Sequence, residues 1–139
     1  MHNNKELALK VNEEVWNRGN FENLEEMFAR EFVQHFLPFG THTTGLEEFR
    51  RRSMKHRAAF PDWKEVVNLV AAEGDYVTLQ YTSTGTNTGS FLGNPPTGKK
   101  IRINEMTIFR IVEGKIIEQW LLPDILSLNQ QLGINMSNR

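Results

Sequence analysis

Residues 100–122 read KIRINEMTIFRIVEGKIIEQWLL, and this stretch decides the fold. Apolar and polar residues alternate on both sides of Glu113-Gly114-Lys115, which is typical of two half-buried strands joined by a tight turn. We therefore predict a strand over 100–112 and a returning strand with one face formed by Ile116, Glu118, Trp120 and Leu122. The register of the turn decides which faces meet, and a slip of one residue would reverse them.

The same reasoning predicts a second hairpin upstream. Val67, Leu69 and Ala71 alternate before Glu73-Gly74-Asp75, and the alternation resumes over 77–83. The segment 89–98 contains Pro95-Pro96 between two glycines and is predicted to be a loop. The chain from Trp63 to Leu122 is thus expected to form an antiparallel sheet.

The first 60 residues predict helices. Leu7, Val11 and Val15 recur every four residues, after Asn3 or Asn4 as a possible cap and before Gly19 as a stop. A second short helix would present one apolar face, and a third would run from a capping box at Thr44–Glu47 to Phe60. A short extended piece at 32–36 and a final helix over 125–132 complete the prediction, and the basic side chains Arg50, Arg51 and Arg52 are expected on a solvated helix face.

Helices that precede a run of long strands indicate an α+β fold. We expect a cone-shaped, strongly curved antiparallel sheet with about three N-terminal helices enclosing an apolar pocket, and a short C-terminal helix. The 139 residues are expected to form a single domain over 1–139, with a frayed tail at 134–139.

Composition limits the function classes. A net charge of -1 gives no basic stripe for nucleic acid or for an anionic membrane surface. There is no cysteine, the four histidines lack His-x-x-x-His spacing, and neither a signal peptide nor a membrane span is evident. We therefore expect a cytoplasmic protein without a metal site, a cofactor, a nucleic-acid partner or a membrane partner.

Aromatic residues are placed to line the predicted cone. Each could equally be a core residue, and the set that we expect to contact a substrate is Trp16, Phe60, Trp63, Tyr81 and Trp120. Phe91 belongs to the same group of candidate lining residues.

Several short motifs together resemble the SnoaL-like polyketide cyclase family. They are Phe60-Pro61-Asp62-Trp63, the segments GTNTG (85–89) and PPTGK (95–99), Phe109-Arg110, and GKIIEQW (114–120) followed by Asp124 and QQLG (130–133). The resemblance covers nearly the whole chain and implies a nuclear transport factor 2-like fold, commonly homodimeric. That superfamily also includes isomerases, epoxide hydrolases, dehydratases and non-catalytic modules, so the fold does not define the function.

The resemblance implies that Asp124, the aspartate after the tryptophan strand, is the general acid/base of an intramolecular aldol closure. A carboxylate in an apolar cavity has a raised pKa and can take the proton next to a carbonyl group. The alternative is that Asp124 caps the final helix, which would lower its pKa. His35 is the second catalytic candidate, as a donor to a substrate carbonyl or a partner of a carboxylate, and its alternative is a satisfied core histidine.

Three further residues are candidates for substrate binding. Asn87 stands where the family often has histidine, and an amide can orient a carbonyl but cannot shuttle protons. Asn104 and Met106 are predicted to share a face with Trp120 and to line the pocket. Glu105 then lies on the outward face, within a dimer interface; with the opposite register, Glu105 would itself be the buried carboxylate.

These observations lead to a cofactor-independent cyclase or isomerase that acts on a small apolar, polyketide-like carbonyl compound. A non-catalytic ligand-binding or dimeric accessory protein is the alternative, and an epoxide hydrolase or dehydratase is a third possibility. A homodimer is expected, with the outward face at Thr78, Gln80 and Thr82 as the candidate interface.

Overall fold

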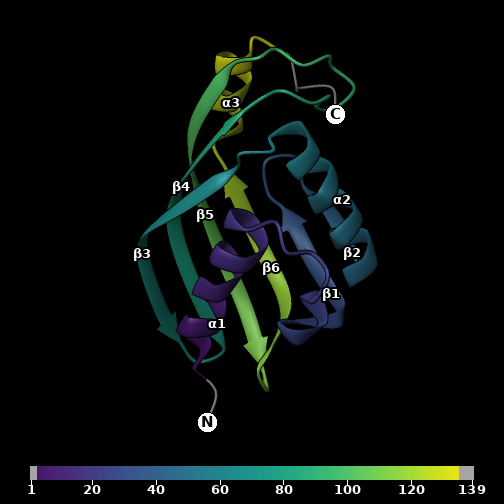
Figure 1. Cartoon of the computed structure of the whole chain (residues 1–139). Helices are drawn as coiled ribbons and strands as arrows, with labels where there is room; N and C mark the ends of the chain where they lie inside the picture. Colours follow the sequence, from purple (N-terminus) through teal and green to yellow (C-terminus); the bar gives the residue numbers. More distant parts are fainter. Residues whose placement is uncertain (1–2, 135–139) are drawn as a thin grey trace.

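The computed structural model describes residues 3–134, and its strands form one sheet. The strands are β1 (Phe28–Phe36), β2 (Thr41–Thr44), β3 (Lys64–Glu73), β4 (Tyr76–Thr86), β5 (Lys100–Val112) and β6 (Lys115–Pro123). Their order across the sheet is β2-β1-β6-β5-β4-β3 (Figure 1). Neighbouring strands are antiparallel except β1 and β6, which run parallel.

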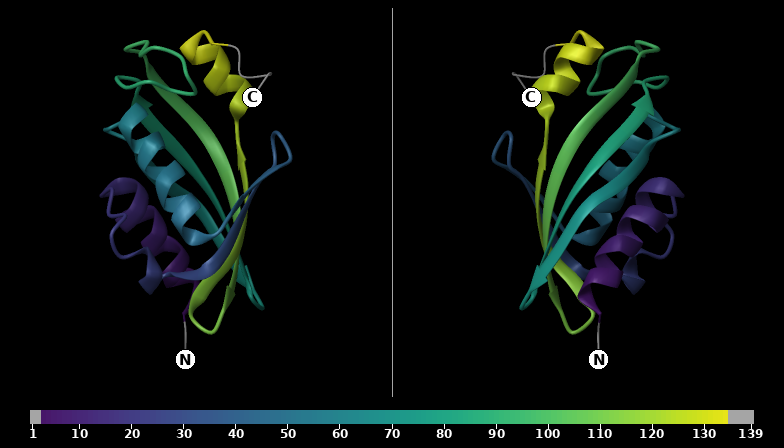
Figure 2. Two further views of the ribbon diagram at one scale, coloured as in Figure 1. Left: turned by 90° about the vertical axis from the view of Figure 1, so that its right-hand side faces the viewer. Right: turned by 90° about the vertical axis from the view of Figure 1, so that its left-hand side faces the viewer.

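Helices cover one face and one end of this sheet. They are α1 (Asn4–Lys10), the π-helix η1 (Val11–Asn17), the 3₁₀ turn η2 (Leu24–Glu26), α2 (Leu46–Ala59) and α3 (Ile125–Leu132). Figure 2 shows the sheet curving around α1 and α2, while α3 lies at one end beside the 87–99 loop. This is the expected α+β cone, and the face toward α1 and α2 is called the inner face below. No helix among residues 3–134 is both long enough and apolar enough to cross a membrane.

Both predicted hairpins are present. β3 and β4 meet around Gly74, and β5 and β6 meet around Glu113 and Gly114, whose φ angles are 50° and 77°. Two successive residues with positive φ form the tight turn whose twist matches that of the flanking strands.

A β-bulge overturns the predicted faces of β6. The register of β5 and β6 shifts between Arg110 and Ile111, so that Ile111 pairs with Ile116 whereas Arg110 pairs with Glu118. Ile116 therefore points inward and is 0% exposed, while Trp120 lies opposite the outward Ile108. The prediction that Ile116 shares a face with Trp120 was wrong because the extra residue of a bulge reverses the alternation.

The N-terminal third also departs from the predictions. The first helix continues as the π-helix η1, β1 is longer than the predicted extended piece, and β2 pairs with it. The capping box is absent, because Thr44 belongs to β2 and α2 begins after Gly45, which makes no side-chain cap. The predicted frayed tail lies, apart from Ile134, outside the described residues.

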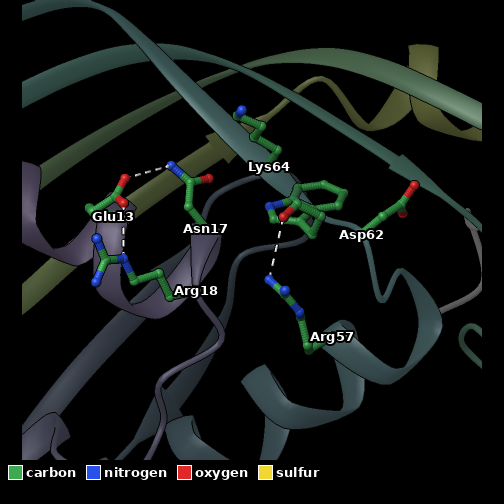
Figure 3. A pocket seen from close by; sticks show the side chains of 7 residues that line it. Glu13, Asn17, Arg18, Arg57, Asp62 and Lys64 are labelled. Atoms are coloured by element: carbon green, nitrogen blue, oxygen red, sulfur yellow. Dashed lines mark hydrogen bonds and ion pairs between the residues drawn. The ribbon is translucent and has the colours of Figure 1, made fainter.

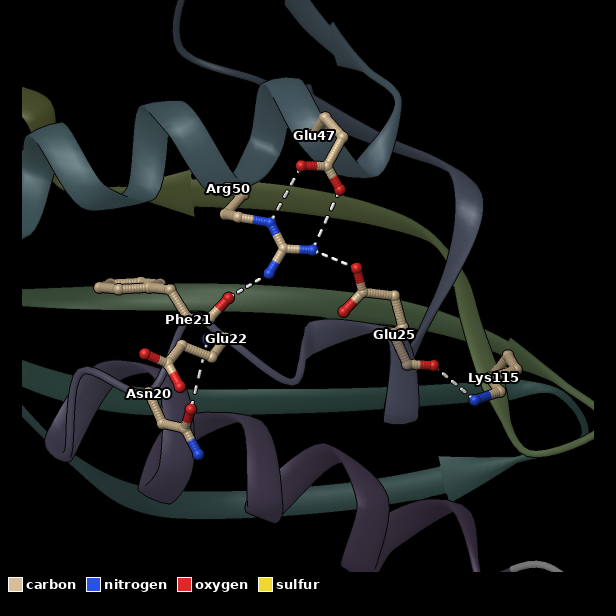
Figure 4. A network of polar contacts seen from close by, with 7 residues as sticks. All are labelled: Asn20, Phe21, Glu22, Glu25, Glu47, Arg50 and Lys115. Carbon is tan, nitrogen blue, oxygen red and sulfur yellow. Dashed lines mark hydrogen bonds and ion pairs between the residues drawn. The ribbon is translucent and has the colours of Figure 1, made fainter.

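Arg50 is not a solvated helix residue. Its guanidinium donates to the carbonyl of Phe21 and pairs with Glu25 at 2.5 Å and Glu47 at 3.0 Å (Figure 4). Lys115 donates to the Glu25 carbonyl at 2.6 Å from the β5–β6 turn. These contacts fix α2 against the segment that leads into β1. Arg51 and Arg52, which pair with Glu48, fit the predicted exposed face.

The interior contains two apolar clusters. The larger one lies under α1 and α2 and contains Val15, Phe28, Phe32, Phe49, Leu79 and Ile111 among others. The smaller one lies near α3 and contains Phe60, Trp63, Ile101, Ile103, Leu128 and Leu132 among others. Along β3 and β5, the inward-facing residues between the two clusters are polar, namely Glu65, Glu105 and Thr107.

Candidate acid–base site

A layer of buried polar side chains crosses the inner face of the sheet. Its members come from β3, β4, β5 and β6 and from η1 above them, and each is 7% exposed or less: Asn12, Glu65, Ser83, Glu105, Thr107 and Gln119. Glu65 follows Trp63 of the smaller cluster and precedes Val67, which packs against the larger one. Polar groups so far from water must find partners, and here most of the partners are one another.

The Glu65 carboxylate accepts two hydrogen bonds from nitrogen donors. Asn12 Nδ2 donates to Oε1 at 2.6 Å, and the indole Nε1 of Trp63 donates to Oε2 at 3.0 Å. The strand alternation that turns Trp63 inward also turns Glu65 inward, so donor and acceptor lie on the same face. The carboxylate is held at both oxygens.

The Glu105 carboxylate is held at one oxygen only. The Ser83 hydroxyl makes a short hydrogen bond to Oε2, and no residue among 3–134 bonds to Oε1. Register pairs Glu105 with Tyr81 and pairs Ser83 with Glu65, so Ser83 connects the two acidic positions across β4.

Burial makes both carboxyl groups weak acids. Glu105 is 6% exposed, and loss of water raises its pKa to about 7, although the Ser83 hydrogen bond opposes the rise. The pKa of Glu65 is also raised, first by burial and then by the charge of Glu105. Two carboxyls that interact across a dry layer titrate as a pair, and the pair retains a proton near neutral pH.

A separate chain of hydrogen bonds lies beside this pair and runs across the sheet. The Tyr81 hydroxyl lies 2.8 Å from Thr107 Oγ1, which also accepts from Gln119 Nε2 at 3.3 Å. Gln34 Nε2 in turn donates to Gln119 Oε1 at 3.0 Å. Burial and then the charges of Glu105 and Glu65 raise the pKa of Tyr81, which keeps its hydroxyl protonated.

Four of the predicted aromatic residues lie on the inner side near the pair. Phe60, Trp63 and Tyr81 are buried, and Trp16 is partly buried between the two clusters. The partly buried His56 joins them, with its ring 4.3 Å from Trp63 and 5.2 Å from Phe60. Burial lowers the pKa of His56 to about 4, so this imidazole is neutral near pH 7.

Asn87 is a hub of the 87–99 loop. It is 1% exposed, and its amide donates to the carbonyls of Ala59 and Gly89 at 3.3 and 2.8 Å. Its oxygen accepts from the Thr97 amide at 3.0 Å and from the Thr97 hydroxyl at 2.9 Å. The side chain is therefore fully engaged by the protein itself.

The remaining predicted residues lie on the outer face. His35 Nε2 lies 2.6 Å from Glu118 Oε2, its Nδ1 lies 2.8 Å from that of His42, and its ring stacks on Trp120 at 5.3 Å. Asn104 is exposed and Met106 is 51% exposed, as the alternation along β5 requires. The predicted shared face of Asn104, Met106 and Trp120 is present, but it is the outer face, and Glu105 is the inward residue.

Asp124 caps α3. Its Oδ1 accepts from the Ser127 amide at 3.0 Å, and the residue is exposed. It borders an outer hollow of about 710 Å³ together with Pro38, Gln80, Asn104, Met106, Leu122, Pro123, Ile125 and Leu126. The structure therefore brings Asp124 together with Asn104 and Met106, but not with the buried pair.

A second hollow, of about 350 Å³, opens at the start of β3. It is lined by Glu13, Asn17, Arg18, Arg57, Asp62, Trp63 and Lys64 (Figure 3). Trp63 thus borders this hollow and also donates to Glu65. Among residues 3–134, no group of three or more histidine or acidic side chains is arranged to hold a metal ion.

The sequence reasoning missed Glu65, Ser83 and Asn12. The alternation that marked Val67 as a strand residue, extended back by two positions, would have turned Glu65 inward beside Trp63. No local signal links Asn12 to Glu65, because 53 residues separate them.

Comparison with known proteins shows to which family this chain is related. The family model described as SnoaL-like polyketide cyclase matches residues 6–132. Aklanonic acid methyl ester cyclase DauD of Streptomyces sp. (strain C5) is 26% identical over 122 residues, which cover 86% of this chain and 76% of that protein. Nogalonic acid methyl ester cyclase of Streptomyces nogalater is 26% identical over 121 residues, with 86% and 90% covered.

The fold agrees with these sequence relationships. A crystal structure from Jannaschia sp. CCS1, assigned to the SnoaL-like polyketide cyclases, superposes with a TM-score of 0.86 at 27% identity and covers 94% of this chain and 91% of that chain. The curved sheet of this chain, the helices on its inner face and the short helix at its end agree with the predicted nuclear transport factor 2-like cone. The chain belongs to the SnoaL-like polyketide cyclase family.

Proposed function

We propose that this protein closes a ring in a polyketide-like carbonyl compound by acid–base catalysis without a cofactor, and that Glu105 and Glu65 move the proton. The observation that carries the proposal is the pair itself. Two carboxyl groups lie buried in one polar layer between apolar clusters, and the pKa of Glu105 is raised to about 7. A general base is most effective when its pKa is near the working pH.

The proposed reaction balances without an oxidant or reductant. The Glu105 carboxylate takes a proton from the carbon next to a carbonyl group, and an enolate forms. The enolate carbon attacks a second carbonyl of the same molecule, so one carbon–carbon bond forms. The resulting alkoxide then takes the proton back from Glu105, and the product is an isomer of the substrate.

Neighbouring groups support the assignment of Glu105 as the acting residue. Its Oε1 has no bond to residues 3–134, whereas both oxygens of Glu65 are engaged. The neutral Tyr81 hydroxyl, opposite Glu105 in the register, is a donor suited to an enolate oxygen. The buried rings of Phe60 and Trp63 make the surroundings of the pair apolar, which favours an apolar, aromatic substrate.

The methyl esters named for the curated relatives, aklanonic acid methyl ester and nogalonic acid methyl ester, are the first substrates to test. We expect turnover of one of them, or of a related methyl ester, and a loss of at least about 100-fold in kcat for Glu105→Gln. Glu105→Gln keeps the size of the side chain, so binding of the ester is expected to persist. Full turnover by a folded Glu105→Gln protein would contradict the proposal, and tight binding with no turnover by the unmodified protein would favour a ligand-binding role.

We also propose that two copies associate through the outer face of the sheet. Large apolar side chains are exposed there: Val66, Leu69, Tyr76, Met106, Ile108 and Leu122. The polar outward residues of β4 predicted for this interface, Thr78, Gln80 and Thr82, lie among them. An apolar sheet face of this kind supports association with a second copy.

A further inference from the structure

The helix that precedes the first loop changes type at Val11. From there to Asn17 it is a π-helix, in which the amide of Arg18 donates to the carbonyl five residues back, at Glu13, with a distance of 3.0 Å. In an α-helix, residues five apart point about 140° away from each other. In a π-helix the hydrogen bond joins residues five apart, so that their side chains lie above one another.

Asn12 and Asn17 are five residues apart, and both contact Glu65. Asn12 Nδ2 donates to the carboxylate at 2.6 Å. Asn17 holds the main chain of the same residue, since its Oδ1 accepts from the Glu65 amide at 2.6 Å and its Nδ2 donates to the Glu65 carbonyl at 3.0 Å. Carboxylate and main chain of Glu65 are therefore held from one helix face.

We propose that Asn12 is a positioning residue for the carboxylate pair, and that the π-helix is the geometry that lets Asn12 and Asn17 hold Glu65 together. The inference rests on the proposed acid–base function, but it concerns how the pair is held rather than what it acts on. Asn17 sets the place of the β3 backbone, and Asn12 sets the direction of the Glu65 side chain and stabilises its charged form.

Few other groups near Glu65 can direct its side chain or stabilise its charged form. Trp63 supplies the second donor to Glu65 from β3, and the titratable groups facing the pair are Tyr81 on β4 and, beyond the Trp63 ring, the neutral His56 on α2. Since a donor to a carboxylate favours its charged form, removal of Asn12 makes the pair hold its proton more tightly.

The test measures NMR chemical shifts as a function of pH, with ¹³C at the glutamate carboxyl carbons and ¹⁵N at the asparagine side chains. In the unmodified protein, we expect the Asn12 side-chain amide to shift over the pH range in which the pair titrates, and the Asn17 amide not to follow it. In Asn12→Leu, which has a similar size but no donor, we expect the proton affinity of the pair to rise about tenfold. Asn12→Asp places a hydrogen-bond acceptor next to the Glu65 carboxylate and is expected to raise the proton affinity of the pair further.

Asn17→Ala is the matched control, because it removes contacts with the Glu65 backbone and leaves the carboxylate contact in place. We expect lower stability and a proton affinity of the pair that changes less than threefold. An Asn12 amide that does not respond to the titration, or an Asn12→Leu protein with unchanged or reduced proton affinity, would overturn the inference. These readouts need no substrate, so they succeed or fail separately from the activity of Glu105→Gln.

Discussion

Glu65 and Glu105 lie in one buried layer on strands β3 and β5, and a charge on Glu105 raises the pKa of Glu65. Strand β4 separates them, and its Ser83 pairs in register with Glu65 and bonds to Glu105. Such a pair destabilises the folded protein once both groups are charged, because neither carboxylate has a cation beside it in the layer. The two carboxyl groups therefore lower the stability of the folded protein at high pH. We explain their presence by acid–base chemistry, which needs a group that holds a proton at this place.

The first prediction concerns stability and pH. The pKa of Glu105 is about 7 in the folded protein and about 4.5 when it is exposed, so between these values the folded state binds more protons than the unfolded state. The contribution of Glu105 to stability is therefore fully present below pH 4.5 and is lost as the pH rises through 7. The loss is on the order of 3 kcal/mol between pH 4.5 and pH 8. Urea unfolding of the unmodified protein and of Glu105→Gln measures it.

We expect Glu105→Gln to lack this loss, since glutamine has no proton to release. The difference between the two proteins isolates Glu105 from groups that titrate in the opposite sense, such as His56. Parallel pH profiles for both proteins would show that the carboxyl is not held in its neutral form.

The second prediction separates Asp124 from the buried pair. Asparagine caps helices as well as aspartate does, so Asp124→Asn is expected to keep its stability and its turnover within about threefold. Asp124→Ala loses the bond to the Ser127 amide and is expected to lower the free energy of unfolding by about 1 kcal/mol. A folded Asp124→Asn protein with turnover reduced by 100-fold would restore Asp124 as the acid/base residue.

The third prediction concerns the loop at one end of the cone. Asn87→Ala removes two hydrogen bonds to Thr97 and one to Gly89 within the 87–99 loop, and one that ties the loop to Ala59 of α2. Because the site is buried, the freed backbone groups lose their partners, and we expect a loss of about 2–4 kcal/mol. Thermal unfolding measures this, with Asn94→Ala in the exposed part of the loop as a milder comparison. Equal effects of the two variants would rule out Asn87 as the hub.

The fourth prediction addresses association. Ile108→Lys places a charge at the centre of the apolar outer face and is expected to convert a dimer to a monomer. Sedimentation velocity measures the change, and Lys55→Glu on the exposed side of α2 is the control. A monomeric unmodified protein, or an unchanged dimer in Ile108→Lys, would refute this interface.

The two hairpins of the sheet could be predicted from the sequence because apolar and polar residues alternate along most of β3 to β6 and both turns contain glycine, although register shifts in β3 and between β5 and β6 interrupt the alternation. The alternation of β5 placed either Asn104 or Glu105 inward, and it could not decide between them, since the choice depends on a bulge that local composition does not signal. Likewise, the spacing of Leu7, Val11 and Val15 fits an α-helix, and nothing in it indicates that the helix becomes a π-helix at Val11.

The candidate site depends on contacts between distant parts of the chain. Asn12 meets Glu65 across 53 residues, and β1 pairs with β6 across more than 80. Motifs near Trp120 and Asp124 identified the family, but the parallel pairing of β1 with β6 and the bulge place them on the outer face and at a helix cap. Family motifs therefore predicted the fold, whereas the site residues that they imply lie apart from the buried carboxyl pair and stay a prediction.

The most direct test of the central claim is a pH titration of the carboxyl carbons of Glu65 and Glu105 by ¹³C NMR, assigned with Glu65→Gln and Glu105→Gln. Our account predicts that Glu105 titrates near pH 7 and that the titration of Glu65 moves to lower pH in Glu105→Gln, because the neighbouring charge has been removed. If both carboxyls titrate near pH 4.5 and neither responds to substitution of the other, they form no coupled acid–base pair.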